Sequence, residues 1–164
     1  MRFDNKTDDE IESWARKYEE ANKADDPAYM LLVEERTKRR QKKQKLDFGK
    51  SLDHLKCCAI AGEFTSYGKL AEASGVTWQA ARHQMNGAYG HLDTLLGECR
   101  RADLPLLTAI CVNQQNLQLG TLGEEALLGF ADGARRVGYE VIDAEGFHSQ
   151  CVKECFEWGK AQKS

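Results

Sequence analysis

The sequence predicts an α+β protein, mostly α, in which a central winged helix-turn-helix carries a helical N-terminal arm and a C-terminal helical extension. Helical periodicity with capping signals recurs along most of the chain, which favours helices as the main elements. In the middle, residues 64–86 combine a short extended entry, a small helix, a turn at Gly75 and a second helix, and the apolar run 106–112 follows. This order is typical of a helix-turn-helix followed by a strand and a wing, which is a nucleic-acid-reading arrangement.

The length and composition fit one soluble domain with appendages. A chain of 164 residues with 41% hydrophobic and 30% charged residues can build a core and keep a solvated surface. No apolar run approaches the roughly 20 residues that cross a bilayer, and no apolar segment follows a basic start at the N-terminus. We therefore expect a cytoplasmic protein without membrane contact, with an arm over 1–46, a winged helix over 47–122 and a packed extension over 123–164.

Two helices are expected in the arm. Thr7 fits an N-cap with Glu10 three positions later, and an apolar stripe at helical spacing then predicts a helix over 8–22. Asp26 followed by Pro27 starts a second helix, because proline fits the first helical turn. This second helix runs on into a strongly basic stretch.

Charge is unevenly distributed along the arm. Acids dominate residues 2–35, whereas residues 36–45 hold seven bases and no acid. Lysine and arginine there could lie along phosphates and add a salt-dependent affinity that is independent of base sequence. The run could instead be a solvated helix end, and the acidic first helix could fold over it or present a surface to a protein partner. The candidate phosphate contacts are Arg36, Lys38, Arg39, Arg40, Lys42 and Lys43.

Capping residues frame the predicted helix-turn-helix. Helices are expected over 46–61, 67–73 and 78 to about 86. Gly62 suits the end of the first of them, and Ser66 and Thr77 suit the N-caps of the other two. Gly75 supplies the turn, since glycine tolerates positive φ. The phenylalanine and threonine within 63–65 favour a short strand before the small helix.

The remaining elements are expected to be a strand, a wing or loop, and helices. A helical stripe ends at Arg101, and the apolar run 106–112 has the length and residue types of a strand. The polar, turn-rich segment 113–123 is either a wing or a longer loop. Further helices are expected over 124–136 and from 143 or 144 to about 162, with a short strand or extended link over 139–142.

The second helix of the predicted motif carries polar side chains that can read DNA. Gln79, Arg82, His83 and Asn86 recur at spacings that place them on or near one exposed face. Glutamine, arginine and asparagine can all bond base edges in a major groove. Tyr67 and Lys69, on the small helix, would then sit at the DNA backbone. The alternative is a small helical pair whose polar face is simply solvated.

A family resemblance supports this interpretation. The segments that carry it are Ser66-Tyr67-Gly68-Lys69-Leu70-Ala71, Ala80-Ala81-Arg82, and Leu104-Pro105-Leu106 leading into Cys111. Together, over about fifty residues, they resemble the winged-helix domain of the alkylguanine-DNA alkyltransferases. The resemblance implies that Tyr67 lies near a flipped nucleotide and that Arg82 enters the duplex where the base was.

The same comparison argues against alkyl transfer. The family's reactive cysteine lies in Pro-Cys-His-Arg, whereas this chain has Ile110-Cys111-Val112-Asn113. Apolar neighbours raise the pKa of a thiol and leave it unreactive. A helix inserted between Arg82 and Cys111 also makes this spacing longer than the family's. The resemblance therefore implies the fold and DNA contact without the reaction.

No other motif indicates an enzyme or a cofactor. All six cysteines lie inside apolar patterns, so we expect reduced core residues. His148, Cys151 and Cys155 share a helical face and are types that bind zinc, but a structural site needs four ligands, usually from two segments. We interpret that face as part of the core and expect no metal. Phosphate-binding and dinucleotide-binding glycine motifs are missing from the sequence.

The sequence thus predicts a non-enzymatic protein that binds double-stranded DNA, of a regulatory kind or from a mobile element. A second hypothesis is a protein-interaction module that binds and blocks a nucleic-acid-processing machine through its acidic arm, since fold does not fix function. An alkyltransferase relative or a metal-assisted hydrolase is a third, and it requires an activated thiolate or a bound ion.

Overall fold

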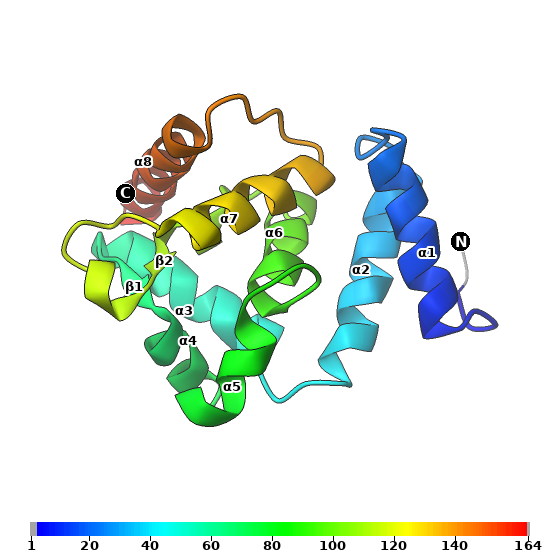
Figure 1. Ribbon diagram of the computed structural model, residues 1–164, viewed down its shortest axis with the longest axis horizontal. Coiled ribbons are helices and arrows are strands. Elements are labelled where there is room, and N and C mark those ends of the chain that lie inside the picture. Colours follow the sequence, from blue (N-terminus) through cyan, green and yellow to red (C-terminus); the bar gives the residue numbers. More distant parts are fainter. Residues whose placement is uncertain (1–2, 164) are drawn as a thin grey trace.

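The computed structural model describes residues 3–163 and is mostly helical, which confirms that part of the prediction (Figure 1). The helices of this part of the chain are α1 (Asp8–Glu20), α2 (Pro27–Gln41), α3 (Phe48–Ala61), α4 (Tyr67–Ala73), α5 (Trp78–Met85), α6 (His91–Arg101), α7 (Glu124–Arg136) and α8 (Ala144–Lys163). Two strands, β1 (Thr65–Ser66) and β2 (Cys111–Val112), and two 3₁₀ turns, η1 (Leu107–Ile110) and η2 (Gln114–Asn116), complete it. No helix among the described residues is both long and apolar enough to cross a bilayer.

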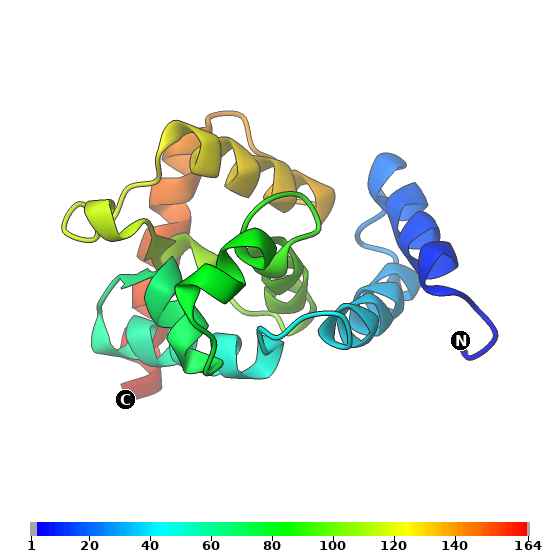
Figure 2. The same ribbon diagram turned by 60° about the horizontal axis from the view of Figure 1, so that its bottom comes forward.

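The arm is an antiparallel helical hairpin with its own small core. The Thr7 hydroxyl accepts from the Glu10 amide, and the Asp26 carboxylate accepts from the Ala28 amide, so both expected N-caps are present. The apolar side chains of the two helices are buried against one another. Figures 1 and 2 show the hairpin beside the rest of the molecule, connected by residues 42–47 and packed through α2 against α6.

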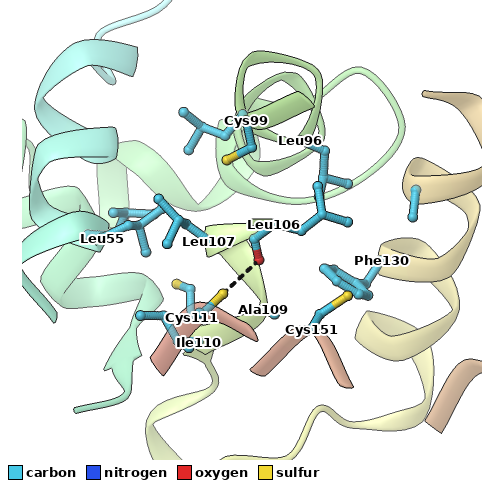
Figure 3. Packing of buried hydrophobic residues seen from close by; sticks show 14 of the residues in the cluster. Leu55, Leu96, Cys99, Leu106, Leu107, Ala109, Ile110, Cys111, Phe130 and Cys151 are labelled. Atoms are coloured by element: carbon cyan, nitrogen blue, oxygen red, sulfur yellow. Dashed lines mark hydrogen bonds between the residues drawn. The ribbon is translucent and has the colours of Figure 1, made fainter. Parts of the chain in front are cut away.

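The larger body is built around η1. Leu107, Ala109 and Ile110 are fully buried, with α3, α6 and α8 packed against them (Figure 3). In the same view a dashed line marks the bond from the Cys155 thiol to the carbonyl of Leu106, 3.3 Å long. The segments 47–122 and 123–164 share this one apolar cluster.

The apolar run 106–112 differs from its prediction as a strand. Only Cys111 and Val112 are extended, and the preceding four residues form η1. Every residue of the run is buried, so its apolar pattern could not separate a strand from a helical turn. The two extended residues pair in parallel with β1, with Thr65 opposite Cys111.

The predicted wing is also not a β-hairpin. Within residues 3–163 the sheet consists of β1 and β2 alone, and residues 113–123 form η2 followed by a loop. Residues 139–142 form an extended link rather than a strand. For 113–123 the sequence left a wing or a longer loop open, and the structure has the loop. For 139–142 it left a strand or a link open, and the structure has the link.

Candidate nucleic-acid interface and adjoining cavity

Helices α4 and α5 form the expected helix-turn-helix. The Ser66 hydroxyl accepts from the Lys69 amide at 3.2 Å and starts α4, while Thr77 caps α5 in the same way. Gly75 between them has a φ of +73°, a conformation that favours glycine. Leu70 and Met85 are fully buried and anchor the two helices on the body.

The outer face of α5 carries the polar residues singled out in the sequence. Gln79, Arg82, His83 and Asn86 are all exposed. Arg82 has no ion pair and no side-chain hydrogen bond to any residue from 3 to 163, whereas most arginines of the chain are bonded internally. Its guanidinium therefore keeps all of its donors available to an external ligand.

An aromatic pair lies at the start of α5. The rings of Tyr67 and Trp78 are stacked, with centroids 6.1 Å apart and planes inclined by 17°. Trp78 is 41% exposed, so its ring is available to a partner, while Tyr67 is half-buried. Burial raises the pKa of Tyr67 to about 12, and its hydroxyl stays neutral at physiological pH. Lys69, two residues further on, is exposed.

The basic run 36–45 does not form a free phosphate-binding strip, because its arginines are bonded to acids of α1. Arg36 is only 6% exposed, and its guanidinium donates to the Glu19 carboxylate at 3.0 Å. Tyr29 donates to the same carboxylate oxygen. This buried network ties α2 to α1 and withdraws Arg36 from any contact with an external phosphate.

Acids of α1 also bind the next two arginines. Arg39 donates to Asp8 at 3.0 Å, and Arg40 forms a two-pronged bond to the Glu12 carboxylate with both distances at 2.8 Å. Lys43 lies 2.9 Å from Asp8 as well, and its hydrogen bond, followed by that of Arg39, lowers the Asp8 pKa. Of the two arrangements considered from sequence, the acidic helix folding over the run is the one observed.

Several lysines of the run remain exposed. Lys38 faces solvent beside Glu34, and Lys42 and Lys45 are exposed without an ion pair to any residue in 3–163. Just after them, the Asp47 amide donates to the Ser74 hydroxyl at 2.9 Å, where α4 ends. The linker after α2 therefore ends at the turn of the motif (Figure 2).

A cavity of about 630 Å³ adjoins the motif, and it was not predicted from the sequence. Tyr67 and Asn86 line it from the motif, Thr108 and Cys111 from the η1–β2 segment, and Phe130 from α7. Its walls come from four separate stretches of chain, none of which has a recognisable pattern. Only the fold brings them together.

The cysteine that the resemblance aligns with a reactive thiol is not activated. Cys111 is 1% exposed, and burial raises its pKa far above the ordinary value, so the thiol is protonated at neutral pH. Cys151 and Cys155 are buried in the core, and His148 bonds the Ala109 carbonyl at 2.9 Å. Among residues 3–163, no three metal-ligating side chains gather at one point.

A comparison with protein-family models, with curated proteins and with solved structures found no match. The likeness to the alkyltransferase winged helix consequently rests on the residues quoted above. The geometry adds the exposed α5 face, the stacked aromatic pair and the neighbouring lysines as independent grounds for a functional proposal.

Proposed function

We propose that this chain is a non-enzymatic DNA-binding protein of the cytoplasm, and that it inserts α5 into the major groove of double-stranded DNA. The observation that carries the proposal is the exposed polar face of α5 with Arg82 unpaired within residues 3–163. A helix of this kind fits the groove, and arginine is the side chain that most often makes a specific base contact, to guanine.

The surrounding residues take supporting roles in this proposal. Lys69, Lys42 and Lys45 contact phosphates, which fixes the position of the protein and adds salt-dependent affinity. The resemblance assigns Tyr67 to a site near the contacted nucleotide. It would place Arg82 in the base stack, whereas the proposed groove contact keeps Arg82 at a base edge. Loop 113–123, which follows β2, takes the place of a wing, so that the central unit acts as a winged helix. The proposal includes a regulatory role, and the buried, protonated Cys111 thiol argues against alkyl transfer.

Fluorescence anisotropy with labelled duplex DNA tests the proposal. The protein is first titrated into random-sequence duplex at low and moderate salt, and a preferred duplex is then selected from a random pool. Replacing Arg82 by alanine should cost about 1–3 kcal/mol of binding free energy on the preferred duplex. Arg135→Ala is the control and should leave the affinity of the folded protein unchanged, because Arg135 lies at the far end of α7, where its guanidinium is bonded to Asp132 and to the Val141 carbonyl.

Two results would overturn the proposal. The first is no measurable binding to any duplex at low salt, because phosphate contacts are strongest there. The second is equal affinity of the Arg82→Ala variant and the parent for the preferred duplex.

A second candidate function is supported by the charge of the arm. The hairpin also exposes acids that do not pair with the arginines of α2, including Asp9 and Glu20, and a protein partner could bind them. An acidic surface of this kind could mimic phosphates and block a nucleic-acid-processing machine. That function predicts no duplex binding at any salt concentration, so the same titration separates the two candidates.

A further inference from the structure

The cavity beside the motif has walls suited to an apolar ligand. Its lining includes three leucines and two aromatic residues: Leu92, Leu96, Leu122, Tyr67 and Phe130. Figure 3 shows Leu96, Cys111 and Phe130, three of the lining side chains, around the η1 segment. A volume of about 630 Å³ lies within the range that holds small organic molecules.

The charges that line the cavity all have one sign. Asp93, Glu124 and Glu125 line it, together with no lysine, arginine or histidine among the described residues. Arg136 neutralises Asp93 at 2.8 Å, whereas both glutamates are exposed and have no ion pair within residues 3–163. The N-terminus of α7 offsets only about half a unit of charge. The mouth of the cavity is therefore distinctly negative.

We propose that the cavity binds a small organic cation: an amine or quaternary ammonium group on an apolar, ring-sized body. The apolar body packs against the leucines, and the cationic group lies on the acidic side of the cavity, which Glu124 and Glu125 line. Tyr67 and Phe130 also line the cavity, and aromatic rings attract cations. Small anions are repelled by the same carboxylates. The site goes beyond the proposed DNA contact, with which it shares Tyr67 and Asn86, and its binding is tested without DNA.

Three probes of matched size test the charge preference on the full chain without DNA. Phenethylamine is a cation at neutral pH, phenethyl alcohol is neutral, and phenylacetate is an anion. Isothermal titration calorimetry and saturation-transfer NMR should show saturable binding of the amine, weaker binding of the alcohol and none of the anion. Equal binding of all three, or no saturable binding of the amine, would overturn the proposal.

Variants locate the binding in this cavity. The double change Glu124→Gln and Glu125→Gln should weaken amine binding about tenfold, by loss of charge attraction. Glu145→Gln, a first-turn acid of α8 that does not line the cavity, is the matched control and should bind as the parent does.

A filling variant tests the site without removing any polar group. Gly129 lines the cavity, and a Cβ added there meets no atom within 4 Å. Gly129→Leu should fold at least as well as the parent, since leucine favours a helix more than glycine does, while its side chain occupies the cavity and abolishes amine binding. Unchanged amine affinity in a folded Gly129→Leu protein would contradict the assignment. Because DNA is absent from these titrations, their failure would leave the proposed function of α5 unaffected.

Discussion

His91 makes the stability of this protein depend on pH in a way that can be worked out from its contacts. The imidazole is completely buried, stacked on Phe48 with ring centroids 4.7 Å apart. Its Nδ1 accepts from the Gln44 amide at 2.8 Å, and its Nε2 bonds the Ser51 hydroxyl at 2.7 Å. The Gln44 amide nitrogen also donates to the Leu46 carbonyl at 2.9 Å, which fixes the amide orientation and leaves Nδ1 as an acceptor.

Protonation of His91 would put an N–H on Nδ1, which then points at the N–H of the Gln44 amide and loses its hydrogen bond. Burial lowers the pKa of His91 from 6.5 to about 4, although the charge of Asp47 opposes the shift. Between these two values the unfolded chain binds the proton and the folded chain does not, so the free energy of unfolding falls as pH decreases. Each pH unit by which the His91 pKa differs between the folded and unfolded chain is worth about 1.4 kcal/mol. The free energy of unfolding is therefore about 3 kcal/mol lower at pH 4 than at neutral pH.

Denaturant unfolding at a series of pH values from neutral to about 4 measures this effect. We expect His91→Gln to be less stable than the parent at neutral pH, since it loses the stack and one bond, and to lose much less stability on acidification. His54 and His148, whose pKa values burial also lowers, and Asp8 are present in both proteins. Their contributions therefore cancel in the difference between the two profiles.

The matched control is His83→Gln, because His83 is exposed on α5 and its ring is in water in both states. This variant should reproduce the pH profile of the parent. If the parent and His91→Gln lose stability in parallel over this range, the reasoning about the buried imidazole is refuted.

Two further predictions concern packing and the thiols. Gly159→Ala should destabilise the fold by about 3 kcal/mol, because a Cβ there overlaps the Ala59 backbone where α8 crosses α3; Gly129→Ala, in open space, should not. Equal urea midpoints of the two variants would contradict this. With Ellman's reagent, Cys57 should react rapidly in the native protein, and the buried thiols, whose pKa values burial raises, only on unfolding: Cys99, Cys111, Cys151 and Cys155. Rapid native modification of Cys111 would instead revive the hypothesis of an activated thiolate.

Local signals made the helices predictable, because each depends on neighbours in the chain. Ser66 and Thr77 accept bonds from amides three residues later, and Gly62 ends α3 with a φ of +74°. Such contacts depend on only a few consecutive residues, so a sequence pattern can predict them. The solvent-facing side of α5 also followed from spacing, since Ala81 and Met85 are buried and Arg82 is exposed.

Features that depend on distant partners could not be predicted in the same way. The run 106–112 is surrounded by other elements, so no solvent-facing side exists to impose an alternation that would mark a strand. The cavity is lined by residues from four stretches of chain, and no sequence pattern within one stretch indicates that the four come together.

The basic run illustrates why composition alone misplaces a charged surface. Arg36, Arg39 and Arg40 are on the part of α2 that α1 covers, and a guanidinium that loses water there needs a carboxylate partner. The positive charge left for an external polyanion is then concentrated beyond the helix, at Lys42 and Lys45. Because the Asp47 amide is bonded to Ser74, that linker is held at the turn of the helix-turn-helix. A chain with a net charge of −3 can thus offer DNA one local positive surface, with α1 acting as the counter-charge for the remainder of the run.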